Sequence, residues 1–144
     1  MLQKRKNIDT EYDSWLLEQA QLLRQGDFDN LDIKNLVEEL EALVRGEKSS
    51  VEQFAYLIML HLLLVDYWHE QAEWTRSHWE AEIIGFRLQL NNKLTTNLRN
   101  HLTERLDYLY SKAYKAAIKK TQNSIKEERF PITRKYSLED ILND

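Results

Sequence analysis

The 144-residue sequence contains no cysteine, one proline and three glycines. Without cysteine the chain has no disulfide framework, thiolate zinc site, iron–sulfur cluster or cysteine nucleophile. So little proline and glycine excludes a collagen-like or low-complexity chain and argues against an all-β fold, whose many turns consume both residues. The absence of cysteine also fits a reducing compartment, so we expect a cytoplasmic protein.

Long hydrophobic runs are also missing. The most apolar stretch, residues 54–65, is shorter than the ~20 residues needed to cross a bilayer, so we expect a buried helix and no membrane association. The basic residues Lys4, Arg5 and Lys6 are followed by no apolar segment, so we expect no signal peptide. At roughly 100–200 residues per domain, residues 1–144 should form a single helical domain. We expect residues 1–8 to be flexible at its start.

The charges are unevenly distributed along the chain. Lysine and arginine number 20 and aspartate and glutamate 24, which gives a net charge of −4. Residues 1–90 carry 9 basic and 17 acidic side chains, and residues 91–144 carry the remaining 11 and 7. We expect acidic and basic helix faces to pack near one another, since net charge governs solubility and association rather than fold.

Apolar residues at helical spacing predict a first helix and a very long second one. Asp9 or Thr10 can cap the first helix, and Gly26 can close it. Asp32 can cap the second, whose apolar positions are 33, 36, 37, 40, 43, 44, 51, 54, 58, 62, 65 and 68. Their phase is unbroken across the polar segment 45–50, which favours one helix over residues 32–70 with Gly46 as the position that permits a bend.

The rest of the chain predicts two further long helices and a C-terminal arm. Ser77-x-x-Glu80 has the pattern of a capping box, and Thr95 or Thr96 can cap a helix that ends near Lys120. Residues 121–136 are polar and should form an extended arm, and Ser137-x-x-Asp140 should start a short last helix. The sequence thus predicts an all-α helical bundle of four principal helices, with one unusually long second helix and a C-terminal arm ending in a short helix.

Four histidines raise the question of a metal site. Di-iron helical bundles need a Glu-x-x-His pair on each of two helices. The residues three positions before His61, His69, His78 and His101 are Ile58, Asp66, Thr75 and Leu98. The sequence also has no phosphate-binding glycine motif and no serine nucleophile motif. We therefore expect no metal and no cofactor.

Two groups of side chains remain as candidates for a pocket. Glu38 and Glu39 belong to a carboxylate cluster that is typical of a solvated helix face but could do acid–base work if one member were buried. His61 stands alone in the apolar run, as a hydrogen-bonded core histidine does. We expect Trp68, Trp74 and Trp79 to hold one corner of the bundle together, each with its N–H bonded. The alternative is a pocket, with Glu38, Glu39, His61 and Trp79 as its candidate residues.

Basic side chains follow the predicted fourth helix. Arg105, Lys112 and Lys119 are spaced seven residues apart, and Lys115 lies nearby. Such a stripe can follow the phosphates of a nucleic acid. It can equally neutralise the acidic long helix, which requires no further partner.

Six short motifs occur in order along the chain. They are Tyr12-Asp13-x-Trp15-Leu16, Leu22-Leu23-Arg24-x-Gly26, Leu31-Asp32-x-x-Asn35-Leu36-x-Glu38-Glu39, Leu60-His61-Leu62-Leu63, Ser77-x-Trp79 and Tyr136-Ser137-Leu138-Glu139-x-Ile141-Leu142. Together they resemble the bacterial domain of unknown function family twenty-nine, which is especially abundant in cyanobacteria. The resemblance implies an all-helical cytoplasmic protein of unassigned activity, with no catalytic or binding residue to carry over. The chain departs from the family pattern at residues 122–124 and at Lys135, where members often have glycine or proline.

By elimination we expect a non-enzymatic helical module that binds a protein partner or itself. The alternatives are nucleic-acid association through the basic stripe and an enzyme that uses Glu38 or Glu39 with His61. A second helix about 57 Å long exceeds the ~30 Å of a twenty-residue neighbour, so shorter helices cover it only by packing at both ends. If they leave part of it bare, a two-fold homodimer is the simplest way to cover the rest.

Overall fold

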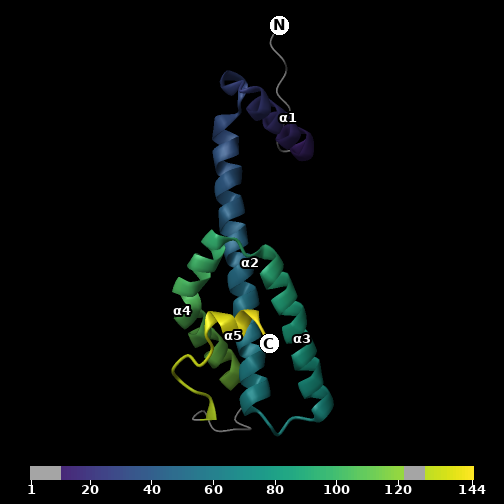
Figure 1. Ribbon diagram of the computed structural model, residues 1–144, viewed down its shortest axis with the longest axis vertical. Helices are drawn as coiled ribbons and strands as arrows, with labels where there is room; N and C mark the ends of the chain where they lie inside the picture. Colours follow the sequence, from purple (N-terminus) through teal and green to yellow (C-terminus); the bar gives the residue numbers. More distant parts are fainter. Residues whose placement is uncertain (1–10, 122–128) are drawn as a thin grey trace. The chain divides into compact units, whose positions relative to one another are not determined.

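The computed structural model describes residues 11–121 and 129–144. Its elements are α1 (Tyr12–Gln25), the 3₁₀ turn η1 (Phe28–Asn30), α2 (Ile33–Tyr67), α3 (Glu73–Lys93), α4 (Thr96–Thr121) and α5 (Leu138–Leu142) (Figure 1). The described residues contain no strand, so the expected all-α fold with an unusually long second helix is confirmed. The chain divides into two compact units, Met1–Leu43 and Val44–Asp144.

α2 runs without interruption through the boundary between the two units. It covers Ile33–Tyr67, close to the predicted 32–70, and Gly46 lies inside it. The polar segment 45–50 is therefore helical, as the unbroken phase of the apolar positions indicates. Ser49 and Glu52 mimic a capping box in sequence only, because no helix begins there.

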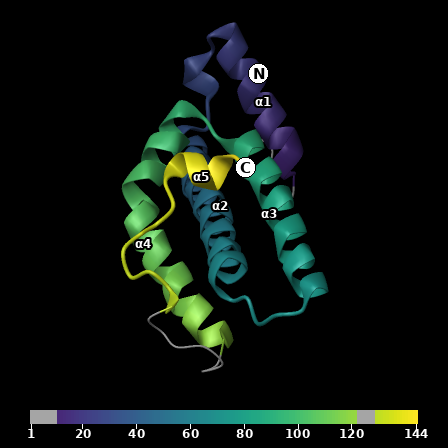
Figure 2. The same cartoon turned by 60° about the horizontal axis from the view of Figure 1, so that its bottom comes forward.

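The core of the second unit surrounds the C-terminal half of α2. Seven side chains of this half are buried: Val51, Ala55, Ile58, Met59, Leu60, Leu63 and Leu64. α3 and α4 lie on either side of it, and α5 crosses between them (Figure 2). The apolar run 54–65 is thus used inside the unit, since a helix that is hydrophobic all round requires burial.

The C-terminal segment is fixed to this core. Phe130 is 1% exposed, and its ring meets that of Tyr67 at 6.2 Å. Ser137 and Asp140 form the predicted capping box of α5. Arg87 donates to the carbonyls of Asp140 and Ile141 at 2.8 and 3.2 Å, so α3 satisfies the backbone acceptors of α5. Of the predicted arm 121–136, residues 122–128 lie outside the described residues, and residues 130–136 are neither helix nor strand.

Two predicted helix starts are wrong or fall outside the structure. α3 begins at Glu73 after Ala72, one turn before the predicted cap Ser77. The amides of Thr75 and Arg76 already donate to the carbonyl of Ala72, so the turn before Ser77 is helical and leaves no cap position there. Asp9 and Thr10 lie outside the described residues, and the N-cap position of α1 is Glu11. Thr95 does cap α4, accepting from the Leu98 amide at 3.2 Å.

Candidate interaction surfaces

The first unit is a helical hairpin formed by α1 and the start of α2. Gly26 ends α1 with a φ of 70°, the left-handed conformation that glycine adopts without strain. The amides of Gly26 and Asp27 donate to the carbonyls of Leu23 and Leu22 at 3.1 and 2.9 Å. This is the C-terminal glycine cap that the sequence predicts, and it turns the chain toward α2.

Three polar contacts fix α1 against the first turns of α2. The buried Trp15 donates through Nε1 to the Asp32 carboxylate at 3.0 Å, and the Asp32 amide donates to Gln19 Oε1 at 2.8 Å. The hydroxyl of Tyr12 donates to Glu39 at 2.7 Å. This hydrogen bond to a carboxylate raises the pKa of Tyr12. α1 therefore occupies the side of α2 that presents Asp32 and Glu39.

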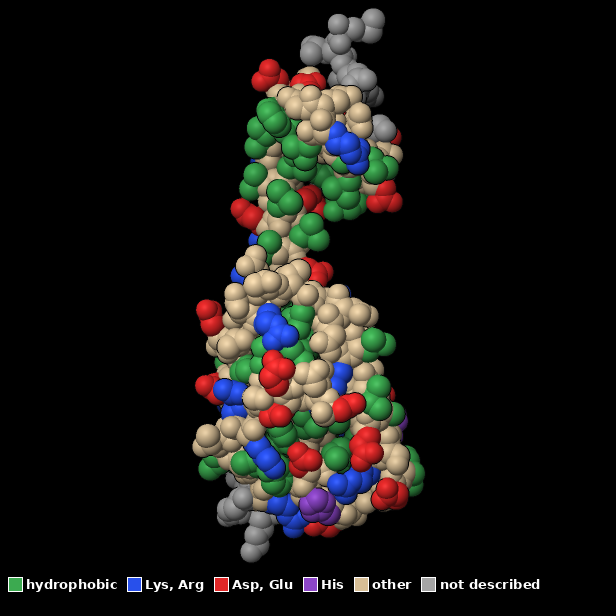
Figure 3. All heavy atoms as spheres, viewed as in Figure 1, with side chains coloured by type: hydrophobic (Ala, Val, Ile, Leu, Met, Phe, Trp, Pro, Cys, Tyr) green, Lys and Arg blue, Asp and Glu red, His purple; other side chains and the backbone are tan. Residues whose placement is uncertain are grey.

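The hairpin leaves much of its apolar surface uncovered. Fourteen large hydrophobic side chains are exposed in the described part of the chain, and eight of them belong to the first unit. Figure 3 shows hydrophobic side chains gathered over this unit. Four lie on α2, between 46% and 61% exposed, and we call them the hairpin face: Ile33, Val37, Leu40 and Leu43. This apolar exposure makes the hairpin face a candidate interaction surface.

The candidate pocket residues lie in different units. Glu38 and Glu39 belong to the first unit and His61 and Trp79 to the second. Glu38 is exposed, and Glu39 accepts from Tyr12. Within the second unit, the ring of His61 meets that of Phe86, whereas Trp79 stacks on Trp68.

His61 has the contacts of a core histidine. Its Nδ1 lies 2.7 Å from the carbonyl oxygen of Leu57. Because a carbonyl only accepts, this nitrogen carries the proton. The ring meets Phe86 edge-on at 5.5 Å. Burial lowers the pKa of His61, so the neutral imidazole is favoured.

The tryptophan corner forms with two members instead of three. Trp68 and Trp79 stack with ring centroids 5.7 Å apart. Trp74 is 76% exposed and takes no part in this stack. The Nε1 atom of Trp68 is buried and has no hydrogen-bond partner among the described residues, so the expectation that each indole N–H is bonded is wrong.

Part of the predicted basic stripe borders a groove between α2 and α4. The groove has a volume of about 620 Å³ and is lined by Arg45, Lys48, Ser49, Glu52, Gln53, Tyr56, Tyr108, Leu109 and Lys112. Lys112 lies over the Tyr108 ring, 5.4 Å from its centroid, and the Arg105 guanidinium lies 4.1 Å from the same centroid. Lys115 and Lys119 are exposed farther along α4.

One carboxylate offsets part of this positive charge. Glu52 accepts from Arg105 Nε at 3.1 Å and from His101 Nε2 at 2.9 Å. Burial alone would raise the pKa of Glu52, but the hydrogen bonds from His101 and Arg105 outweigh it and lower the pKa. The expectation that the stripe neutralises the acidic long helix thus applies to Arg105. Sequence analysis missed Arg45 and Lys48, because only the packing of α4 on α2 brings them beside Lys112.

A metal site and a membrane-spanning helix are the remaining kinds of candidate site. Within residues 11–121 and 129–144, no three histidine, aspartate or glutamate side chains are placed to hold a metal ion. By length and mean hydropathy α2 could cross a membrane, and 39% of its most apolar window is buried inside the protein. The core helix of a water-soluble protein meets the same two criteria.

These features define an all-α protein in which a helical hairpin and a helical bundle share one long helix. The family model for the domain of unknown function DUF29 matches residues 8–144, so the chain belongs to this family. No curated protein and no solved structure matches the chain.

Proposed function

We propose that the chain is a non-enzymatic helical module that binds another protein through the hairpin face. The concentration of exposed apolar side chains in the first unit carries this proposal. The second unit buries its own apolar run, with Ile58 and Leu63 at 0% exposure, so this run is covered without a partner. The hairpin face, by contrast, has its apolar side chains in water.

Burial of this face supplies a driving force of a useful size. Full burial of a valine, leucine or isoleucine side chain is worth about 1.5–3 kcal/mol. Association costs about 4–15 kcal/mol in lost freedom. Because the four side chains are 46–61% exposed, burying them gains about half of that, about 3–6 kcal/mol in total, so binding also needs contacts beside the face and is reversible. The candidate catalytic groups support a non-enzymatic function as well, since Glu39 and His61 are engaged by Tyr12 and Leu57.

The test compares two variants that each replace two exposed aliphatic side chains by serine. Val37→Ser/Leu40→Ser alters the hairpin face. Ile84→Ser/Leu88→Ser alters two exposed side chains of α3, each 63% exposed. Tagged wild-type and variant chains are used to capture proteins from host lysate, and each captured protein is purified and its direct binding measured by calorimetry. Direct binding that is lost only in the hairpin variant supports the proposal, and equal binding by both variants contradicts it.

The groove between α2 and α4 supports a second function, association with single-stranded nucleic acid. Arg45, Lys48 and Lys112 supply positive charge, and Tyr56 and Tyr108 supply faces on which bases can stack. Phosphate contacts make affinity fall steeply between about 50 and 200 mM salt. Fluorescence anisotropy of a labelled oligonucleotide should show this fall for the wild type. Lys48→Gln/Lys112→Gln should weaken binding more than Lys119→Gln/Lys120→Gln, which removes the same charge outside the groove.

A further inference from the structure

We infer that the partner on the hairpin face is a second copy of this chain, bound with the two α2 helices antiparallel. This inference rests on the proposed function and names its partner. Three observations carry it: the spacing of the apolar residues, the position of α1, and a pair of opposite charges that becomes complementary only in this arrangement.

The apolar residues of the hairpin face have the spacing of a coiled-coil seam. Ile33, Val37 and Leu40 are separated by four and then three residues. An average spacing of 3.5 residues keeps side chains on one line facing a parallel or antiparallel helix. The seam therefore fits another helix better than a flat or irregular surface.

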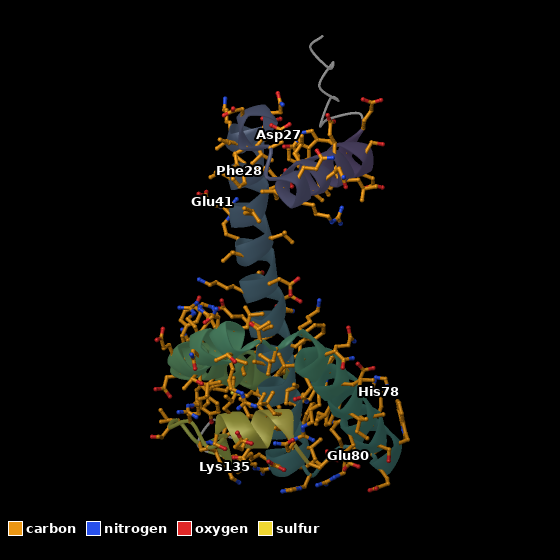
Figure 4. All side chains as sticks on the ribbon, turned by 45° about the horizontal axis from the view of Figure 1, so that its top comes forward. Asp27, Phe28, Glu41, His78, Glu80 and Lys135 are labelled. Carbon is orange, nitrogen blue, oxygen red and sulfur yellow. The ribbon has the colours of Figure 1, made fainter. Side chains whose placement is uncertain are left out.

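α1 leaves this seam open. A residue advances by about 100° around an α-helix, because a turn holds 3.6 residues. The seam thus lies about a third of a turn from the side that presents Asp32 and Glu39 to α1. Figure 4 shows Glu41 on the side of α2 away from α1. Around α2 the order is α1, the seam, and then the edge that carries Lys34 and Glu41.

An antiparallel pairing fixes the register through the centre of the seam. The spacing makes Val37 an a position and Leu40 a d position of a heptad. In an antiparallel pair, each a position of one helix faces a d position of the other. Val37 then faces Leu40 of the second copy, and Leu40 faces Val37 of the second copy. A two-fold axis passes between these two layers, so the contact is closed and stops at a dimer.

The same register brings opposite charges together on one flank. Lys34 lies beside Glu41 of the second copy, and Glu41 lies beside Lys34 of the second copy. Both side chains are exposed, and neither makes an ion pair within the part of the chain that the structure describes. A parallel pairing would instead put Glu41 beside Leu36 of the second copy. Charge complementarity therefore selects the antiparallel orientation.

The other flank is apolar and lies next to α1. The antiparallel register sets Leu36 beside Leu43 of the second copy, and Leu43 is 61% exposed in a single chain. The two-fold axis is perpendicular to both α2 helices, so both copies of α1 lie on this flank. Two hairpins then form a four-helix arrangement that covers the leucines and leaves the charged edge in water.

The test uses the purified full-length chain in sedimentation equilibrium at micromolar concentration. The wild type should reach twice 17.3 kDa. Lys34→Glu or Glu41→Lys alone sets like charges together twice in each dimer and should weaken dimerisation about tenfold. An equimolar mixture of the two variants restores both opposite-charge pairs, so it should form a heterodimer about as tightly as the wild-type dimer. Glu38→Lys makes the same charge change as Glu41→Lys away from the seam and should leave dimerisation unchanged.

A wild-type chain that stays at 17.3 kDa overturns the inference. So does a mixture of Lys34→Glu and Glu41→Lys that associates no better than each variant alone. If the purified chain is monomeric while Val37→Ser/Leu40→Ser still abolishes binding to a different protein, the second copy is wrong and the proposed function stands. If the hairpin variants change neither measurement, both fail.

Discussion

The hydroxyl of Tyr136 donates a hydrogen bond to the carboxylate of Asp66, 2.6 Å away and 70 residues earlier in the chain. Tyr136 is buried, and its ring lies edge-on to that of Tyr110 at 6.4 Å. Burial and the neighbouring carboxylate raise the pKa of Tyr136 far above its ordinary value. This contact joins the C-terminal segment to the last turn of α2.

Tyr136→Phe should lower the free energy of unfolding by about 1–3 kcal/mol, because it removes a buried hydrogen bond to a charged acceptor. Tyr12→Phe is the matched control, since Tyr12 also donates to a carboxylate but is 42% exposed. Tyr12→Phe should lower the free energy of unfolding by less than about 0.5 kcal/mol. Urea denaturation measures both values, and equal losses would show that burial of Tyr136 does not strengthen the bond.

The core of the second unit gives a second prediction. Leu106 is 3% exposed on α4. Leu106→Ala should therefore cost about 2–5 kcal/mol through lost transfer energy and a residual cavity. Leu88→Ala removes the same atoms from a side chain that is 63% exposed and should cost less than about 0.5 kcal/mol. A small loss at Leu106 in chemical denaturation would place this side chain outside the core.

Gly46, which lies inside α2, and Gly26, which ends α1, should respond in opposite ways to substitution by alanine. Gly46 lies inside α2, and a Cβ atom there would have nothing within 4 Å. Gly46→Ala should stabilise the protein by about 0.5–1 kcal/mol by raising helix propensity. Gly26 has a φ of 70°, so Gly26→Ala should destabilise by about 1 kcal/mol. A lower midpoint temperature of thermal unfolding for Gly46→Ala would show that α2 needs a break at this residue.

His61 gives a pH-dependent prediction. Because burial lowers its pKa below the ordinary 6.5, the unfolded chain takes up a proton at a higher pH than the folded chain. The contribution of the neutral ring is therefore present above pH 6.5 and is lost as the pH falls below it. Denaturation between about pH 7 and pH 5 should show a smaller loss for His61→Leu than for the wild type.

Local signals in the sequence predicted the helices well. The end of α1 was predictable because its left-handed cap depends on one glycine, Gly26, and on backbone amides next to it in the chain. The Ser137 capping box is equally local. The phase of the apolar positions predicted that α2 continues through Gly46, because only one helix keeps residues so far apart in register.

Where the sequence prediction failed, a competing local structure or a contact between elements decided the outcome. Ser77 has a capping motif, but the helix starts at Glu73 because the four preceding residues are themselves helical. Trp74 is exposed and takes no part in the stack of Trp68 and Trp79, and its spacing in the sequence does not distinguish it from these two. Arg45 and Lys48 join Lys112 only through the packing of α4 on α2. The sequence raised a partly bare long helix as a possibility, but which of its apolar positions stay exposed depends on contacts between elements, because the seam residues look like those of a core.

α2 is a single helix whose two halves are buried to different degrees. Of the described residues 11–43, two are buried, Trp15 and Gln19, whereas the half from Val51 onward is enclosed by the core. Amide hydrogens between Ile33 and Leu43 should therefore exchange with deuterated water much faster than those between Ile58 and Leu64. A bound partner would slow exchange in the first stretch alone. The protection profile along one continuous helix thus reports whether the hairpin is occupied.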